Sequence, residues 1–446
     1  MAKSWVFVLI MVVYLACVTG CKSADDIESN TKSNIDNAKR FVIDLSKGDF
    51  TSAESQFDME VAKALPVDKL SEMWQSIEKQ VGAFKQQTGV RTEKLSGYEV
   101  IFVISKFEKA ELDIRVVYDK SGKIAGLQVL PHSEGSAAYK SAPYVKTGSF
   151  TDSSISVGTG EFKLPGTLSI PKGKGPFPVV ILVHGSGPND RDETIGPNKP
   201  FRDLAEGLAS KGIAVLRYDK RTKVYPMKML GNITVKDETI DDVVIAVNQM
   251  RTTLNINPKR VYVLGHSLGG MLIPRIASRD SGISGFIVMA GAARQLENAM
   301  VEQYEYIFNA DGSISDDEKK QLDAIKIEVA KVQDPKLSID GPSILGAPSS
   351  YWLDLRGYHP PTDAKQIMQP LLVLQGGRDY QVTIKEFDDW KKALASNKNV
   401  SFRLYPALNH LFIAGEGKST PAEYQIAGHI DVPVINDIAS FILRKK

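Results

Sequence analysis

The sequence predicts an α/β protein, in which helices cover both faces of a mostly parallel sheet, preceded by a small domain of helices and strands. From about residue 144 onward, short apolar runs alternate with helical periodicity, as in parallel sheets buried on both faces. Before residue 132, two helical segments are followed by strands that alternate apolar and polar residues. The 446 residues also exceed what one core usually holds, so we expect about two domains and a leader.

The first 20 residues resemble an export signal. Lys3 supplies a positive charge, and the mostly apolar run that follows is shorter than the roughly 20 residues of a membrane-spanning helix. Val18-Thr19-Gly20-Cys21 is similar to a bacterial lipobox, in which cleavage precedes a cysteine that is acylated. We therefore expect a signal peptide at 1–20, a lipid anchor on Cys21 that holds the protein on a membrane of the cell envelope outside the cytoplasm, and a flexible tether at 21–34. The alternative is an ordinary secretory signal without lipid.

A small α+β domain is predicted over residues 35–132. Apolar residues recur at helical spacing in two segments, from Ile35 to Leu45 and from Leu70 to Phe84. Strands are expected at residues 98–104, 112–118 and 124–130. The pattern looks like the helix-and-curved-sheet domain often found between bacterial lipoprotein signals and attached enzymes. None of its residues points to catalysis, so packing or partner binding is the expected role.

The second predicted domain covers residues 144–446. Two hairpin-like strands precede expected strands at residues 178–183, 213–218, 260–264, 283–289, 371–374 and 401–405, with helices between them. An insertion at about 293–361 interrupts this alternation, first charged and helical, then irregular and aromatic. Because aromatic side chains commonly line ligand pockets, we expect the insertion to form a cap over the active site. The alternative is a surface excursion without substrate contact.

Charge and cysteine content exclude several classes of protein. Lys and Arg number 55 against 53 Asp and Glu, a formal charge of +2, so nucleic acid is not an expected partner. Both cysteines, Cys17 and Cys21, precede the predicted domains. The domains therefore have no cysteine nucleophile, disulfide or thiolate ligand for a metal.

The segment Gly265-His266-Ser267-Leu268-Gly269 fits the pattern G-x-S-x-G between an apolar strand and a helix. The pattern alone is common by chance, but this context is what a nucleophile elbow requires. The tight turn lifts the serine Oγ above the sheet and demands small residues two positions before and after it, where glycine stands. Ser267 is the predicted nucleophile.

A nucleophilic serine needs a base, and the base needs an orienting carboxylate. Asp379 and His410 each follow a predicted strand, which places them at the edge of the sheet where such sites form. Asp388 and Asp389 fall inside a helix and point away from that edge. Of the six histidines, only His410 stands at a suitable strand end. The sequence therefore predicts a triad of Ser267, His410 and Asp379.

Backbone N–H groups that bind the developing oxyanion are the third requirement of acyl transfer. His184-Gly185-Ser186-Gly187 follows a buried strand, so we expect the N–H groups of Ser186 and Leu268 to form the oxyanion hole. The charged loop 189–193 either holds a polar end of the substrate or pairs internally. We favour pairing, because clustered charges are usually solvated or paired.

These segments together resemble the EstD-type bacterial carboxylesterases of the α/β-hydrolase superfamily. The resemblance rests on HGSGPNDRDETIGPNKPFRD (184–203), LRYDKR (216–221), GHSLGG (265–270) and LNHLF (408–412), and it extends from about Ser154 to the C-terminus. It implies an α/β-hydrolase fold, an additional N-terminal domain, and action on short acyl esters with the same triad and without a metal. No cofactor is expected.

The predicted function is that of a serine carboxylesterase, which hydrolyses small to medium acyl esters through an acyl-enzyme. Its expected partner is a small-molecule ester. One alternative is a serine peptidase or acyltransferase with the same triad, although no domain suited to an extended peptide is evident. The other is a non-catalytic lipoprotein that binds a partner, although nucleophile, acid, base and oxyanion loop are all intact.

Overall fold

The computed structural model describes residues 24–95, 98–132, 139–229 and 231–444. The chain divides into two compact units, Met1–Ala137 and Ala138–Lys446, and each is described by itself. The predicted signal peptide and Cys21 lie outside the described residues. Within the described part of the chain, no helix is long and apolar enough to cross a membrane.

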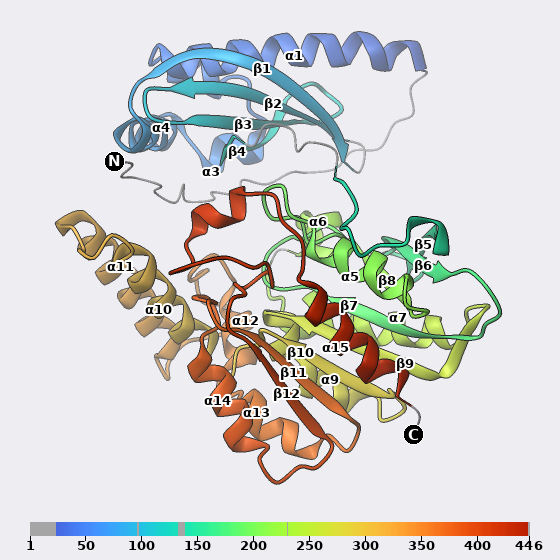
Figure 1. Ribbon diagram of the computed structural model, residues 1–446. Coiled ribbons are helices and arrows are strands. Elements are labelled where there is room, and N and C mark those ends of the chain that lie inside the picture. Colours follow the sequence, from blue (N-terminus) through green and yellow to red (C-terminus); the bar gives the residue numbers. More distant parts are fainter. Residues whose placement is uncertain (1–23, 96–97, 133–138, 230, 445–446) are drawn as a thin grey trace. The chain divides into compact units, whose positions relative to one another are not determined.

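The first unit is an antiparallel meander of four strands in the order β1–β2–β3–β4, packed against helices (Figure 1). Its helices are α1 (Ala24–Ser46), α2 (Phe50–Glu54), α3 (Met59–Ala64) and α4 (Val67–Val81). Its strands are β1 (Phe84–Leu95), β2 (Tyr98–Phe107), β3 (Glu111–Tyr118) and β4 (Ile124–Pro131). Apolar residues of α1 and α4, such as Phe41 and Trp74, are buried against Ile114 and its neighbours in the sheet.

Two predictions for this unit are wrong. α1 begins at Ala24, so residues 24–34 are helical and not a flexible tether. Three of the first five residues of α1 are acidic, which favours a helix N-terminus although the composition alone reads as a linker. Phe84 begins β1 and does not continue α4, because Gly82 ends the helix with φ at 82°. β1 is polar over much of its length, so the apolar pattern does not reveal this edge strand.

The second unit is built on an eight-stranded sheet in the order β12–β11–β10–β9–β7–β8–β6–β5. Its strands are β5 (Phe150–Val157), β6 (Leu164–Pro171), β7 (Phe177–Val183), β8 (Ala214–Tyr218), β9 (Ile256–His266), β10 (Gly285–Met289), β11 (Leu371–Gly376) and β12 (Val400–Tyr405). β6 runs antiparallel to its neighbours β5 and β8, and the other pairs are parallel. The carboxyl ends of six parallel strands therefore meet at one edge of the sheet.

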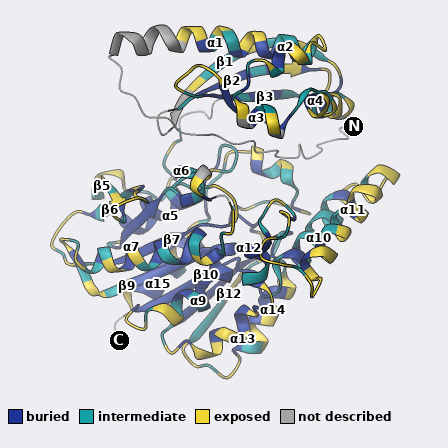
Figure 2. Ribbon diagram, turned by 180° about the vertical axis from the view of Figure 1, so that it is seen from behind, coloured by how far each residue is buried: buried dark blue, intermediate teal, exposed yellow. Residues whose placement is uncertain are grey.

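Helices cover both faces of this sheet (Figure 1). They include α5 (Pro200–Ala209), α6 (Arg221–Val224), α7 (Asp241–Arg251), α8 (Leu268–Met271), α9 (Ile273–Arg279), α14 (Ile384–Ala393) and α15 (Val432–Leu443). α5 contacts α15, and α7 contacts α9. β8, β10 and β11 are buried along their whole length, whereas the edge strands β5 and β12 are partly exposed (Figure 2). The predicted fold, a mostly parallel α/β sheet behind a small α+β domain, is confirmed.

The insertion between β10 and β11 is helical for most of its length. It contains α10 (Leu296–Phe308), α11 (Asp316–Gln333), α12 (Ser349–Leu355) and α13 (Pro360–Asp363), so its second half is not as irregular as predicted. Tyr351, Trp352 and Tyr358 are buried, and the hydroxyl of Tyr358 donates to the carbonyl of Met271 at 2.7 Å. Tyr351 and Tyr358 belong to the main core. These two aromatic residues therefore anchor the insertion, which corrects the expectation that they face the substrate.

Candidate active site

Ser267 stands in a strained turn between β9 and α8. Its φ is 53° and its ψ is −117°, a conformation that side-chain-bearing residues rarely adopt. A Cβ at Gly265 would lie 2.2 Å from the carbonyl oxygen of Gly269, and a Cβ at Gly269 would lie 2.3 Å from that of Val183. Both positions therefore require glycine, and the turn has the tight backbone geometry that a nucleophile elbow needs.

Asp379 and His410 are in direct contact at the ends of two neighbouring strands, β11 and β12. Asp379 Oδ2 lies 2.7 Å from His410 Nδ1, and both side chains are buried. The other carboxylate oxygen accepts the backbone N–H groups of Gln381 at 2.8 Å and Val382 at 3.0 Å. The carboxylate is thus held in one orientation and in turn orients the imidazole, with Nε2 left for proton transfer.

His266, the residue before Ser267, also contacts His410. His266 Nε2 donates to the backbone carbonyl of His410 at 3.0 Å, and the two rings have centroids 4.7 Å apart. No hydrogen bond joins Ser267 Oγ to the His410 ring, although both residues are within the described part of the chain. In serine hydrolases this contact often tightens only when substrate binds.

The loop after β7 lies directly against the elbow. A Cβ at Gly185 would stand 3.1 Å from the Cβ of Ser267. The N–H of Gly185 donates to Glu193 Oε1 at 2.7 Å and is therefore occupied. The N–H groups of Ser186 and Leu268 have no acceptor among the described residues, and Leu268 begins α8. The two amides predicted for the oxyanion hole are thus unpaired; one lies in the loop after β7 and the other at the start of α8, directly after Ser267.

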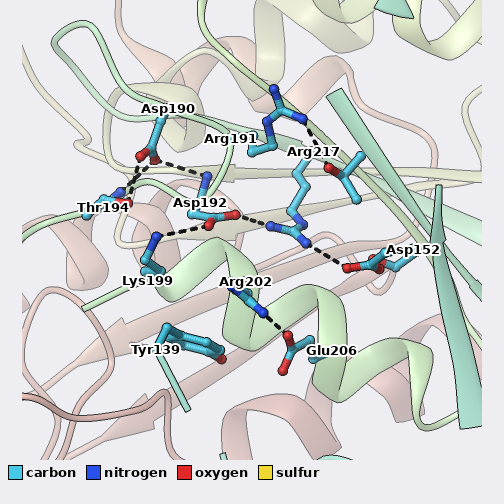
Figure 3. Close-up of polar contacts among 12 residues, drawn as sticks. Tyr139, Asp152, Asp190, Arg191, Asp192, Thr194, Lys199, Arg202, Glu206 and Arg217 are labelled. Atoms are coloured by element: carbon cyan, nitrogen blue, oxygen red, sulfur yellow. Dashed lines mark hydrogen bonds and ion pairs between the residues drawn. The ribbon is translucent and has the colours of Figure 1, made fainter. Parts of the chain in front are cut away.

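The charged loop 189–193 pairs mainly within the protein (Figure 3). Asp192 pairs with Lys199 and Arg217, and Arg217 also pairs with Asp152. Arg191, also in this loop, forms a salt bridge with Asp219 at 2.8 Å. The ion pairs of this loop are thus made with residues outside it and not within it, and no side chain caps α5, but the pairing supports a structural role over one in holding the substrate.

His184 braces the same loop, as expected from its position. Its Nε2 lies 3.0 Å from the carbonyl oxygen of Asp190. Burial lowers the pKa of His184 to about 4, so its ring is neutral at pH 7 and donates from Nε2.

Sequence reasoning missed the buried pair of Glu193 and His266. Glu193 Oε2 lies 2.8 Å from His266 Nδ1, and both residues are almost fully buried. Burial favours the neutral form of each side chain, but the opposite charge outweighs it. The pKa of Glu193 is lowered and that of His266 is raised. The pair is therefore ionic. In the sequence, nothing distinguishes Glu193 from the other charged residues of its polar loop.

An apolar cluster adjoins the acid and the base. Tyr380 follows Asp379, Leu411 follows His410, and both pack with Tyr424. Tyr306 of α10 stacks on Tyr380 with ring centroids 5.0 Å apart and planes 6° apart. The insertion therefore contacts the loops that carry Asp379 and His410 through Tyr306. Tyr351 and Tyr358 of the insertion lie in the main core instead.

The chain is similar to known proteins over most of its length. A family model described as "Serine aminopeptidase, S33" matches residues 176–309, and one described as "Protein of unknown function (DUF3887)" matches residues 38–127. Esterase EstD of Thermotoga maritima is 41% identical over 404 residues, which cover 91% of this chain and 94% of that protein.

Two solved structures are similar to part of the chain at low sequence identity. Est1E from Butyrivibrio proteoclasticus is 17% identical, with a TM-score of 0.42 over 65% of this chain and 97% of Est1E. The hyperthermophilic esterase from Pyrobaculum calidifontis is 14% identical, with a TM-score of 0.43 over 66% of this chain and 85% of that protein.

The protein is a serine hydrolase of carboxylic esters, in which an α/β-hydrolase domain follows a small N-terminal domain in the sequence. Within that class, the chain belongs to the family of esterase EstD, which it matches along nearly its whole length.

The elbow generates a first prediction. Gly269→Ala places a methyl group 2.3 Å from the carbonyl oxygen of Val183, so the turn must shift and displace the serine. We expect the rate of ester hydrolysis to drop by about 10²-fold or more, because a displacement of about 1 Å costs that much. Gly148→Ala is the matched control, since a Cβ there meets no atom within 4 Å. Wild-type activity in Gly269→Ala would contradict the tight elbow.

Proposed function

We propose that this esterase acts through a triad of Ser267, His410 and Asp379 and through an acyl-enzyme. The contact of Asp379 with His410 at 2.7 Å, both buried at the sheet edge that carries the strained Ser267, is the observation that supports it most strongly. The unpaired N–H groups of Ser186 and Leu268 supply the oxyanion hole of this mechanism.

In the first half of the reaction, Ser267 Oγ attacks the ester carbonyl carbon while His410 Nε2 takes the hydroxyl proton. Asp379 holds the tautomer that leaves Nε2 free to accept it and stabilises the imidazolium. The carbonyl π electrons move to oxygen, and the N–H groups of Ser186 and Leu268 bind that oxyanion. When the intermediate collapses, the C–O bond to the alcohol breaks, and His410 returns the proton to the departing oxygen.

In the second half, water repeats the sequence on the acyl-enzyme. His410 takes a proton from water as its oxygen attacks the acyl carbon, and the bond to Ser267 Oγ then breaks as the proton passes to the serine. The acid is released and the serine regenerated, so the chemistry needs no group beyond those of the chain and water.

We also propose that the substrate carries a small or medium acyl group. The cluster of Tyr380, Leu411, Tyr424 and Tyr306 supports this, because it places bulky side chains beside the acid and the base. Such side chains leave room for a short chain and restrict a long one.

A peptidase with the same triad is the second candidate, favoured by the description of the family model over residues 176–309. Amide hydrolysis by this triad requires the same proton donation to a poorer leaving group, so p-nitroanilides and p-nitrophenyl esters of one acyl group separate the two candidates.

We further propose that the protein is exported and anchored at the cell envelope by lipid on Cys21. The lipobox-like Val18–Cys21 and the absence of other cysteines after Cys17 support this proposal.

Ser267→Ala removes the nucleophile, and we expect kcat for p-nitrophenyl butyrate to drop by at least about 10³-fold. His410→Ala and Asp379→Asn are expected to cause losses of similar order. The matched control is Asp389→Asn, an exposed carboxylate on α14 that lies in sequence near Asp379. If Ser267→Ala hydrolyses the ester at the wild-type rate, the triad is not the source of the activity.

The acyl preference is measured with p-nitrophenyl acetate, butyrate, octanoate and palmitate, in parallel with the p-nitroanilide of butyric acid. We expect kcat/KM to be highest for the short and medium esters and to drop at palmitate. A flat or rising series would exclude the proposed acyl preference. Turnover of the anilide that is measurable and is lost in Ser267→Ala would favour the peptidase.

Lipid anchoring is measured by expressing the full chain in a bacterium fed a radiolabelled fatty acid. The wild type is expected to carry the label and to sediment with membranes, and Cys21→Ser to lose both. Cys17→Ser is the control, since it lies before the predicted cleavage site. Persistence of label and sedimentation in Cys21→Ser would rule out this anchor.

A further inference from the structure

The backbone of Gly185 is held from both sides by buried charged residues. Its N–H donates to Glu193 Oε1 at 2.7 Å, and its carbonyl oxygen accepts Lys220 Nζ at 2.8 Å. Both residues are only 2% exposed. Burial of a charged side chain is costly unless it is paired, so each needs a further partner.

The carbonyl of Gly185 and the N–H of Ser186 belong to the same planar trans peptide. The direction of the carbonyl therefore fixes the direction of the N–H on the opposite side of the bond. Lys220 holds the carbonyl oxygen of Gly185 with the shorter of two side-chain contacts, the other coming from Asn189 Nδ2 at 3.2 Å, and so helps to set where the Ser186 N–H points. A hydrogen bond to the carbonyl also polarises the peptide and strengthens its N–H as a donor.

Glu193 connects this loop to the elbow. Its second oxygen forms an ion pair with His266 Nδ1 at 2.8 Å, and neither of these two buried atoms has a hydrogen-bond partner among the described residues. His266 immediately precedes Ser267, and its Nε2 donates to the carbonyl of His410 at 3.0 Å. One carboxylate thus joins the oxyanion loop, the strand of the nucleophile and the loop of the base.

Lys220 connects the same loop to the insertion. Its ammonium lies 2.7 Å from Glu238 Oε1, and the other oxygen of Glu238 accepts the hydroxyl of Tyr351 at 3.0 Å. Tyr351 belongs to α12 of the insertion. The two peptides on either side of the Gly185 Cα are therefore each held by a buried chain of polar contacts, the first through Glu193 and the second, which carries the Ser186 N–H, through Lys220.

The backbone of Glu193 shows that this position is special. Its φ is 50°, in the left-handed region that glycine and asparagine adopt more readily than glutamate. Such conformations persist where the surroundings fix them and cluster at functional sites. Both carboxylate oxygens are already engaged, by Gly185 and by His266, so Glu193 has no free oxygen for proton transfer to a substrate.

We propose that Lys220 and Glu193 are positioning residues for the oxyanion hole, which hold the two peptides that flank Gly185 and thereby place the Ser186 N–H relative to Ser267. This inference rests on the proposed triad and oxyanion hole, and it adds residues that the mechanism itself does not use. Their effect belongs to the transition state, because the charge that the Ser186 N–H binds develops only there.

The first test combines Lys220→Met with Glu238→Gln, which removes the ammonium without leaving a buried carboxylate unpaired. We expect kcat for p-nitrophenyl butyrate to drop about 10²-fold, as for one oxyanion donor, with KM changed by less than about threefold. The inhibition constant of a trifluoromethyl ketone, which forms a tetrahedral oxyanion on the serine, is expected to rise by the same factor as kcat/KM drops. If Lys220 had a purely structural role, the variant would have a lower melting temperature but unchanged kcat and inhibition constant.

The second test separates geometry from charge at Glu193. Glu193→Gln keeps the reach to the N–H of Gly185 and donates to a neutral His266, so we expect a loss in kcat of no more than about tenfold. Glu193→Asp keeps the charge but is shorter by one methylene group, so it cannot bridge both partners and loses more. If the Lys220→Met/Glu238→Gln variant does not fold, the test is whether kcat is higher in Glu193→Gln than in Glu193→Asp. An aspartate variant as active as the glutamine variant overturns the proposal.

The matched control is Asp242→Asn, which weakens another buried pair, that of Asp242 with Arg221 at 3.0 Å. It is expected to melt earlier but to keep the wild-type kcat and inhibition constant. Wild-type values of both constants in a folded Lys220→Met/Glu238→Gln variant would overturn the proposal. Ser267→Ala in the same assay distinguishes failure of the triad from failure of the positioning role. If Ser267→Ala is active, the proposed triad is wrong. If it is inactive while the Lys220 and Glu193 variants keep wild-type activity, only the positioning role is wrong.

Discussion

The close approach of the turn at Ser267 to the end of β7 is the constraint on which the rest of the site depends. A Cβ at Gly269 would lie 2.3 Å from the carbonyl oxygen of Val183, so the turn at Ser267 and the end of β7 are in contact through backbone alone. This contact places the start of α8 and the loop at Gly185 around one point in space. The parallel sheet supplies the other two groups at the same edge, because Asp379 and His410 follow β11 and β12.

Buried charges surround this backbone contact, and each is compensated. Glu193 is paired with His266, and Lys220 with Glu238, as buried ions must be if the fold is to tolerate them. Glu193 has its pKa lowered from about 4.5, so its contribution to stability is present above that value and is lost as pH drops through the lowered pKa. His266 has its pKa raised from about 6.5, so its contribution is present below that value and is lost as pH rises through the raised pKa. The pair is thus fully ionic at least across the range between these two ordinary values.

The positions of most strands along the chain and the three candidate residues Ser267, Asp379 and His410 could be predicted from the sequence, because apolar runs mark the strands and a motif or a strand end marks each residue. Asp379 and His410 are indeed in contact. Features without a local pattern could not be predicted. The polar edge strand β1 shows no apolar alternation, and the partner of Glu193 lies 73 residues away in the chain at His266. The aromatic residues of the insertion were assigned to the substrate, but Tyr351 and Tyr358 lie in the core, since composition does not indicate which way a side chain faces.

The central claim, that Ser267 is the nucleophile, is tested most directly by locating a covalent adduct. Trypsin releases the peptide Val261–Arg275, in which Ser267 is the one serine. After inactivation with a fluorophosphonate, mass spectrometry is predicted to find one adduct per molecule on this peptide, in step with the loss of esterase activity. An adduct on another peptide that tracks the loss of activity would contradict the claim.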